Sequence, residues 1–366
     1  MAPFLIVVGL MLIGTIAGVV YVLKNLHKTY IVQKIAKKNH WLGLFAAMIP
    51  LILLVIYAYI DVVNAVVVAL NVIVIYILGQ IIWNIIKKLI KSDTKRNFGA
   101  LAAIVFSIIY LSVGWYLAHH VVVTEYYLTT AKDIGAESVR VVQVSDSHIG
   151  ATFDGEGFAE HMKTVQELKP DVVVITGDYV DDGTTKEDMI IASEALGRLE
   201  TTWGVYYIDG NHDRGYFQTR DFSYEEMLEK LEAEGVIILK DDVTLINDSF
   251  YIVGRADRTD LERADMETLT KDLDKSKYML VLDHQPHDFN AQAAAKVDLV
   301  LCGHTHGGQM FPVGWLGEVT GANDKTYGLE VRDETTFIVN SGISDWAIKY
   351  KTATKAEIGL IVVTME

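Results

Sequence analysis

The sequence predicts an all-α bundle of four transmembrane helices followed by an α/β domain with more than one sheet. Three observations predict this fold class. Residues 1–120 contain four apolar runs close to the ~20 residues that cross a bilayer. In residues 121–366, short runs of β-branched and aliphatic residues alternate with helical patterns. Strand-like runs also follow one another directly at 236–239, 243–246 and 250–253, which indicates more than one sheet.

The four predicted spans cover about residues 4–23, 41–60, 62–86 and 98–118. A cleaved signal peptide is the alternative for the first run. It is disfavoured because no basic segment precedes the run and three further spans follow. The second span contains Pro50, which a helix bundle tolerates when neighbouring groups satisfy the freed carbonyl. We therefore expect a multi-pass protein of the cell membrane.

The loops between the spans predict the orientation. Residues 23–40 and 87–97 are rich in lysine and arginine, and the second loop also holds Asp93 beside Lys95. The positive-inside rule places both loops in the cytoplasm. The domain that follows His119 is then extracytoplasmic. A cytoplasmic domain is the alternative, because one miscounted span reverses the orientation.

Charge and cysteine content restrict the partners. Residues 1–120 hold ten Lys or Arg and two acidic residues, a charge of +8, which leaves −23 for the remainder of a chain whose formal charge is −15. An acidic surface repels nucleic acid within a Debye length of ~8 Å, so we expect no nucleic-acid partner. The expected partner is the lipid bilayer, and no obligate protein partner is evident. Cys302 is interpreted as a small buried hydrophobe rather than a metal ligand.

Helical patterns between the strand-like runs cover 158–168, 186–199, 224–234 and 261–275. This alternation places the carboxyl ends of several strands on one edge of a sheet, where α/β folds bind ligands.

Metal-binding types of residue follow five strand-like runs. These are Asp146 and His148 after 139–144, Asp178 after 171–176, Asn211-His212-Asp213 after 204–208, His284 after 278–282, and His304 and His306 after 297–302. For any one run, a capping aspartate or a hydrogen-bonded core histidine is a sufficient explanation. For all five together, a shared metal site is the better explanation. Carboxylate, amide and imidazole ligands suit Mn²⁺, Fe²⁺ or Zn²⁺.

These residues form five motifs in a fixed order: Asp-x-His, Gly-Asp, Gly-Asn-His-Asp, a lone His and Gly-His-x-His. The order resembles the signature of the calcineurin-like metallophosphoesterase superfamily. The resemblance covers about the last 230 residues, from the first motif at Asp146 onward and the strand before it. The added Gly307-Gly308-Gln309 is similar to a bacterial, membrane-associated branch that contains phosphodiesterases and UDP-diacylglucosamine pyrophosphatases. The resemblance implies two facing sheets flanked by helices.

The resemblance also implies a ligand set for two metal ions. One ion would bind Asp146, His148 and His306, the second would bind Asn211, His284 and His304, and Asp178 would bridge the two. Manganese is the expected metal, with iron or zinc as alternatives.

Two further residues are implied as catalytic. His212 would stabilise the transition state or protonate the leaving oxygen. Asp213 would orient His212, or would cap backbone amides of its own turn instead. The loop 341–346 is similar to a glycine-containing loop near the family's site, and Lys349 is the nearest basic residue that could contact phosphate.

The expected function is metal-dependent hydrolysis of a phosphodiester, phosphomonoester or pyrophosphate bond. Two divalent ions ~3.5–4 Å apart neutralise phosphate oxygens and lower the pKa of a water molecule. Four spans exceed what tethering requires, so the expected substrate is a phosphorylated molecule of the membrane surface or cell envelope. A cytoplasm-facing nucleotide-lipid pyrophosphatase is one alternative. A non-catalytic, metal-binding sensor is another, although a complete ligand set argues against it.

Overall fold

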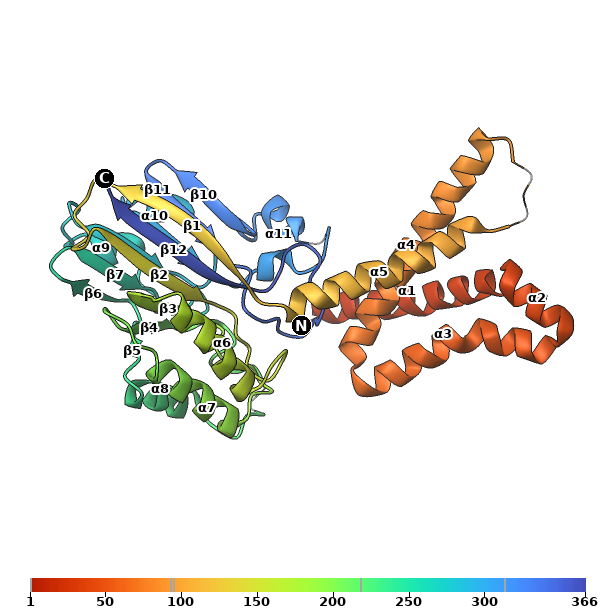
Figure 1. Cartoon of the computed structure of the whole chain (residues 1–366), viewed down its shortest axis with the longest axis horizontal. Coiled ribbons are helices and arrows are strands. Elements are labelled where there is room, and N and C mark those ends of the chain that lie inside the picture. The colour runs from red at the N-terminus through yellow and green to blue at the C-terminus, as the bar shows by residue number, and fades with distance from the viewer. Residues whose placement is uncertain (1, 93, 95, 218, 313) are drawn as a thin grey trace. The chain divides into compact units, whose positions relative to one another are not determined.

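The computed structural model describes the chain apart from residues 1, 93, 95, 218 and 313 and the side chains of residues 2–12 and 315 (Figure 1). The chain forms two compact units, Met1–Val113 and Gly114–Glu366. Asp93 and Lys95 of the second basic loop therefore lie outside the described residues.

The first unit is built from apolar helices. They are α1 (Ala2–Leu26), α2 (Tyr30–Lys38), α3 (His40–Ile60), α4 (Val62–Leu89) and α5 (Phe98–His119), whose last turns belong to the second unit. Among the described residues, α3, α4 and α5 are long and apolar enough to cross a membrane. The predicted first span falls on α1, of which residues 13–26 form a shorter apolar helix in the described part. The sequence did not predict α2, which lies in the first basic loop.

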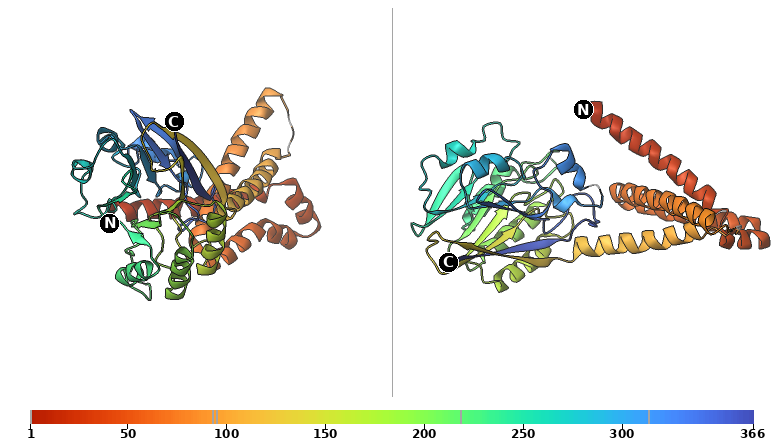
Figure 2. Two further views of the ribbon diagram at one scale, coloured as in Figure 1. Left: turned by 60° about the vertical axis from the view of Figure 1, so that its left-hand side comes forward. Right: turned by 90° about the horizontal axis from the view of Figure 1, so that it is seen from above.

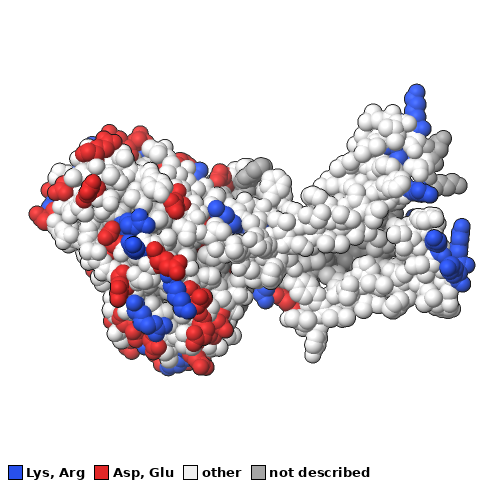
Figure 3. Space-filling model, viewed as in Figure 1, with Lys and Arg blue, Asp and Glu red and all other residues white. Residues whose placement is uncertain are grey.

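Small residues let two helices of this unit approach closely. A Cβ atom on Gly79 would lie 2.9 Å from the Cβ of Ala103, and one on Gly99 would lie 2.6 Å from the carbonyl oxygen of Gly79. The side-chain amides of Gln80 and Asn97 also exchange hydrogen bonds of 3.0 and 2.9 Å. Close packing of this kind, with amide bridges, is typical of helices that associate in lipid. Figure 3 shows Lys and Arg gathered at one end of this unit and uncharged residues along its sides.

The second unit contains two six-stranded sheets, as the resemblance implied. The first has the order β1-β12-β2-β3-β4-β5, built from Val122–Thr130, Glu357–Met365, Ser138–Val144, Val172–Thr176, Val205–Ile208 and Ile237–Ile238. The second has the order β10-β11-β9-β8-β7-β6, built from Gly328–Arg332, Thr335–Val339, Leu299–Cys302, Tyr278–Leu282, Phe250–Gly254 and Asp242–Ile246. Strands β2, β3 and β4 are parallel to one another, as are β7, β8 and β9.

The two sheets face each other across an apolar core (Figure 2). Val141, Val174 and Ile208 of the first sheet share this core with Ile252 and Leu301 of the second. All five side chains are fully buried. Since β2, β3 and β9 contribute apolar residues to both of their faces, they have the continuous apolar sequences of strands that are covered on both sides.

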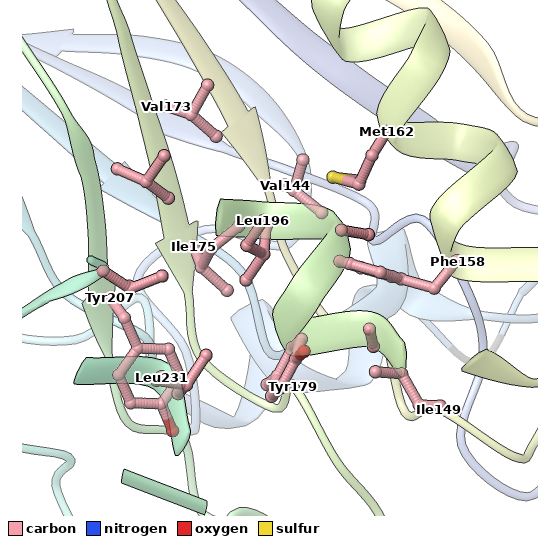
Figure 4. Close-up of a cluster of buried hydrophobic side chains, with 14 of the residues drawn as sticks. Val144, Ile149, Phe158, Met162, Val173, Ile175, Tyr179, Leu196, Tyr207 and Leu231 are labelled. Atoms are coloured by element: carbon pink, nitrogen blue, oxygen red, sulfur yellow. The ribbon is translucent and has the colours of Figure 1, made fainter. Parts of the chain in front are cut away.

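Helices cover the outer face of each sheet. On the first sheet, α6 (Gly155–Glu167), α7 (Lys186–Gly197) and α8 (Tyr224–Ala233) contribute Phe158, Leu196 and Leu231 to a core that includes Ile175 and Tyr207 (Figure 4). On the second sheet, α9 (Met266–Thr270) and α10 (Phe289–Ala294) pack similarly, and the rings of Phe289 and Phe337 stack with centroids 4.0 Å apart.

Two local predictions differ from the structure. Of the helix predicted over 261–275, only α9 forms, because turns occupy the residues on both sides of it. The strand β10 and the helix α11 (Trp315–Thr320) were not predicted. Both follow the last metal-type motif and are too short to show a clear sequence period.

Candidate metal centre

The predicted metal ligands lie at strand ends in an uncommon backbone conformation. Positive φ angles, between 37° and 71°, occur at five of them: Asp146, His148, Asp178, His304 and His306. Non-glycine residues rarely adopt this region, and such residues cluster at functional sites because the surrounding structure must hold them there. The strands therefore end in sharp turns that direct these side chains into one space.

The structure brings the predicted ligands together in two groups. Ligand atoms of Asp146, His148 and His306 lie within 4.8 Å of one another, as do those of Asp178, His284 and His304. Asn211 joins the second group, since its Oδ1 lies 3.2 Å from His284 Nε2.

Asp178 lies between the two groups. Its Oδ2 is 3.1 Å from His284 Nε2 and 3.5 Å from His148 Nε2. Its Oδ1 accepts a hydrogen bond of 2.8 Å from the backbone N–H of His212. The same oxygen, Oδ2, therefore faces a histidine of each group, which is the position expected of a ligand that the two groups share.

Backbone carbonyl groups orient two of the imidazoles. His284 Nδ1 lies 2.8 Å from the carbonyl oxygen of Thr176, and His306 Nδ1 lies 3.2 Å from that of Ser344. A carbonyl can only accept, so each Nδ1 carries a proton, and each Nε2 offers a lone pair to a metal ion once Nε2 is deprotonated. His306 Nε2 faces Asp146 Oδ1 at 3.6 Å, and His284 Nε2 faces Asp178. Both rings therefore present their lone pairs to the predicted metal positions.

The donor set fits divalent cations. Both ring nitrogens of His148 are buried and make no hydrogen bond within the described residues, which is costly unless a cation occupies the space. Glycine also leaves room for the ligands. A Cβ atom on Gly303 would lie 2.4 Å from Asp146 Oδ2, and one on Gly210 would lie 2.3 Å from Asp178 Oδ1. Nitrogen and oxygen donors with no thiolate suit Mn²⁺, Fe²⁺ or Zn²⁺.

The charged groups of the second group shift one another's pKa values. Burial by itself lowers the pKa of His284, but the carboxylate of Asp178 outweighs burial and raises that pKa well above its ordinary value. Burial raises the pKa of Asp178, whereas His284 and His148 hold it well below its ordinary range. Burial, together with the charge of His284, lowers the pKa of His304 to about 4. His304 is therefore neutral at pH 7, which is the form that binds a metal ion.

His212 has a different carboxylate partner from the one predicted. Its Nδ1 lies 3.1 Å from Asp181 Oδ1. Asp213 is fully buried and accepts hydrogen bonds of 2.8 to 3.0 Å from the backbone N–H groups of Tyr179, Val180 and Gly210. Asp213 thus has the alternative role considered from the sequence, that of a carboxylate that caps backbone amides. Asp181, three residues after Asp178, was overlooked.

Two more functional neighbours were missed by sequence reasoning. The side-chain amide of Asn211 donates to the hydroxyl of Tyr216 at 2.8 Å, which turns the amide oxygen toward His284. The ring of Trp346, which is 45% exposed, lies 6.0 Å from the ring of His212. Tyr216 and Trp346 therefore flank His212 on the open side of the site. No local motif marks Tyr216, whereas Trp346 ends the loop 341–346 that the resemblance placed near the site.

A buried ion pair supports His306 from behind. Lys351 and Asp345 are 0% and 1% exposed, with 3.0 Å between Nζ and Oδ1. The same Oδ1 lies 3.5 Å from His306 Nδ1, and Lys351 Nζ also donates to the carbonyl oxygen of Ser341 at 2.7 Å. Burial raises the pKa of Asp345, but Lys351 and His306 outweigh burial and lower it. The sequence suggested Lys349 as the basic residue of this loop, whereas Lys351 is the lysine that reaches the ligand shell.

Comparisons with known proteins agree with this site. The model of the calcineurin-like phosphoesterase family matches residues 139–308, which include every predicted ligand. An uncharacterized metallophosphoesterase of Aquifex aeolicus is 32% identical over 202 residues, covering 53% of this chain and 72% of that protein. An uncharacterized metallophosphoesterase of Campylobacter jejuni is 26% identical over 293 residues, covering 76% of this chain and 75% of that protein. A transmembrane protein with metallophosphoesterase domain from Danio rerio is 31% identical over 246 residues, covering 61% of this chain and 53% of that protein. The resemblance seen in the sequence is confirmed, and the chain belongs to the calcineurin-like metallophosphoesterases, enzymes that use divalent metal ions to hydrolyse phosphoric esters.

Proposed function

We propose that this protein is a membrane-anchored phosphoesterase that uses two divalent ions, with Mn²⁺ as the expected metal, to hydrolyse a phosphodiester, phosphomonoester or pyrophosphate bond. The observation that carries the proposal is the position of Asp178 between two groups of nitrogen and oxygen ligands. When bound, two such ions neutralise phosphate oxygens and acidify a water molecule. Asp146, His148 and His306 would hold one ion, and Asn211, His284 and His304 the other.

The protein's own groups supply the remaining chemistry. His212 is partly exposed beside the ligands, and Asp181 engages its Nδ1, so Nε2 is the nitrogen that can give a proton to the leaving oxygen. Burial lowers the pKa of His212, but Asp181 and Asp178 outweigh burial and raise it, which favours the protonated acid near neutral pH. Tyr216 and Trp346 would contact the group next to the phosphate.

The proposed substrate belongs to the membrane surface or cell envelope, and the catalytic unit is proposed to be extracytoplasmic. Three helices long enough to span a membrane support the anchor, and the basic loops support the orientation. Lys and Arg gather at one end of the helical unit, as expected if both basic loops face the same side (Figure 3).

Hydrolysis of a chromogenic phosphodiester by full-length protein in detergent tests the proposed chemistry. Protein stripped of metal should be inactive, and Mn²⁺ should restore turnover. Asp178→Asn should abolish turnover together with tight binding of both ions. His212→Ala should keep its metal content but lose ~10²–10⁴-fold in kcat, the usual contribution of a general acid.

The control is His287→Ala, which alters a histidine outside the predicted ligand set and should leave metal content and turnover unchanged. Wild-type protein that binds Mn²⁺ but hydrolyses neither this ester nor a monoester or pyrophosphate would refute the enzymatic proposal.

A further inference from the structure

A groove runs along the helical unit between α4 and α5. Ile75, Ile82 and Ile86 of α4 form one wall, and Phe98 and Phe106 of α5 form the other. We name these five residues the α4–α5 groove. The cavity between them has a volume of about 520 Å³, within the ~300–1,000 Å³ that is usual for small-molecule sites. Its lining consists of aliphatic and aromatic residues, glycine and alanine, so the groove suits an apolar ligand.

Close contacts hold the two walls together. A Cβ atom on Gly99 would lie 2.4 Å from the Cβ of Trp83, so glycine permits α5 to approach α4 at this point. The rings of Trp83 and Phe98 meet edge to face, with centroids 5.3 Å apart. The amide of Gln80 donates to Asn97 Oδ1 at 3.0 Å, just before α5 begins. The start of α5 is therefore fixed against α4, and the groove is a formed feature of this unit.

The groove has the length of one leaflet of a bilayer. Ile75 and Ile86 are eleven residues apart on α4, which corresponds to about 16 Å at ~1.5 Å per residue. The hydrocarbon core of a bilayer is ~30 Å thick, so each leaflet contributes about 15 Å. Among the described residues, α4 and α5 are both long and apolar enough to cross a membrane. An acyl chain of one leaflet can therefore lie along the whole groove.

Basic residues gather at one end of the groove. Lys87 directly follows Ile86, and Arg96 lies two residues before Phe98. Residues 87–97 contain five basic residues and one acidic residue, a charge of +4. Figure 3 shows Lys and Arg concentrated at one end of the helical unit. The end of the groove that Lys87 and Arg96 border therefore attracts anions.

The first basic loop adds to the positive charge at this end. The guanidinium of Arg96 lies over the ring of Tyr30 of α2, 5.4 Å from the ring centroid. Helix α2 carries three lysines and no acidic residue. Asp61, the one acidic residue that the structure describes in this unit, caps the opposite end of α4, where its carboxylate accepts a hydrogen bond from the backbone N–H of Asn64 at 3.0 Å. The charge of the helical unit is therefore polarised along the groove.

The headgroup decides which lipid binds here. An acyl chain gains no hydrophobic free energy when it moves from the bilayer into an apolar groove, because both surroundings are apolar. Packing against the groove retains any lipid of suitable chain length, whereas the basic end distinguishes headgroups by their charge. Clusters of Lys and Arg beside a membrane-spanning helix bind anionic lipids.

We propose that the α4–α5 groove binds one acyl chain of an anionic phospholipid, whose phosphate is held at the basic end by Lys87 and Arg96. The lipid is a bound ligand of the helical unit and is not hydrolysed. The inference goes beyond the proposed function and shares with it only the insertion of α4 and α5 into a membrane. A second copy of the chain is disfavoured as the occupant, because copies inserted in the same direction would bring two basic loops together.

The test is native mass spectrometry of full-length protein in detergent micelles that contain equal amounts of phosphatidylglycerol and phosphatidylcholine with the same acyl chains. Ala102→Trp fills the groove, since Ala102 lines the cavity. Leu101→Trp is the matched control, because Leu101 is the neighbouring residue, is 51% exposed and does not line the cavity. Lys87→Gln combined with Arg96→Gln removes the two charges and leaves the groove open.

Wild type and Leu101→Trp should retain phosphatidylglycerol in preference to phosphatidylcholine, whereas Ala102→Trp should lose most of the retained lipid. The double charge variant should still bind lipid but lose roughly 25-fold of its preference, since each Lys or Arg near an anionic headgroup contributes about fivefold.

Equal lipid retention by Ala102→Trp and wild type, or an unchanged preference in the double charge variant, would overturn the proposal. So would a wild-type dimer without bound lipid that Ala102→Trp converts to a monomer. If far-ultraviolet circular dichroism shows that Ala102→Trp does not fold, the double charge variant decides the question by itself.

Turnover of the chromogenic ester by the same samples separates this inference from the proposed function. Turnover by protein that shows no lipid preference would remove the lipid site and leave the enzymatic function standing. Selective retention of phosphatidylglycerol without turnover in any of the three ester assays would do the reverse.

Discussion

The ion pair between Lys351 and Asp345 allows a prediction of definite size. At 3.0 Å, the Coulomb attraction is about 5–6 kcal/mol for an effective dielectric constant of ~20. Removing one partner of a buried pair costs ~3–5 kcal/mol, because the other charge stays buried without compensation. Lys351→Met should therefore lower the melting temperature of this unit by ~6–20 °C, using ~2–4 °C per kcal/mol for domains of this size.

The same substitution should weaken metal binding. Without Lys351, the carboxylate of Asp345 loses its lysine partner, and this carboxylate lies 3.5 Å from His306 Nδ1. Loss of a residue that positions a metal-bound imidazole lowers metal affinity ~10–100-fold. Mn²⁺ titration should show one weakened site, that of Asp146, His148 and His306, and one site of normal affinity.

The assay is thermal unfolding of full-length protein in detergent, followed by near-ultraviolet circular dichroism. The double variant Asp345→Asn with Lys351→Met should recover most of the lost stability, because neither charge is then left unpaired. Lys355→Met, which alters a partly exposed lysine of the same loop, is the control and should melt like wild type. The reasoning is refuted if Lys351→Met also melts like wild type. It is also refuted if the melting temperature of the double variant falls by as much as the decreases of the two single variants added together.

Three further predictions follow from the charges of the site and the predicted topology. Asp181→Asn removes the hydrogen-bonded carboxylate that raises the pKa of His212, so the alkaline limb of the pH–rate profile should move to lower pH, and an unmoved limb would show that His212 is not the acid. The raised pKa of His284 keeps it protonated at pH 7 before metal binds, so Mn²⁺ binding should release protons and strengthen as pH rises. Calorimetry in buffers of different ionisation enthalpy measures this release, and buffer-independent heats would contradict it. In intact cells, Glu125→Cys at an exposed position of β1 should react with a membrane-impermeant maleimide if the catalytic unit is extracytoplasmic, and reaction only after lysis would reverse the proposed orientation.

Much of this protein could be predicted from its sequence because the signals are local. Apolar runs of helical length predicted α3, α4 and α5, and runs of β-branched residues predicted all of the strands that carry ligands. The candidate ligands could be named because each follows such a run within a few residues. A short helix such as α9 was predicted too long, since a weak helical period does not show where turns interrupt it.

The partners of the ligands were decided by tertiary structure alone. Asp181 rather than Asp213 faces His212 because the turn after β4 directs Asp213 toward three backbone amides. Lys351 and His306 are 45 residues apart in the sequence, yet both contact the carboxylate of Asp345, and no sequence motif marks these contacts. The order and direction of β1, β12 and β2 also bring the metal centre to the edge where α5 ends. The sequence by itself determined the candidate ligands and the long apolar helices, since periodicity and motifs act over a few residues. Pairing between distant strands decided which charges meet and which edge of the sheet carries the site.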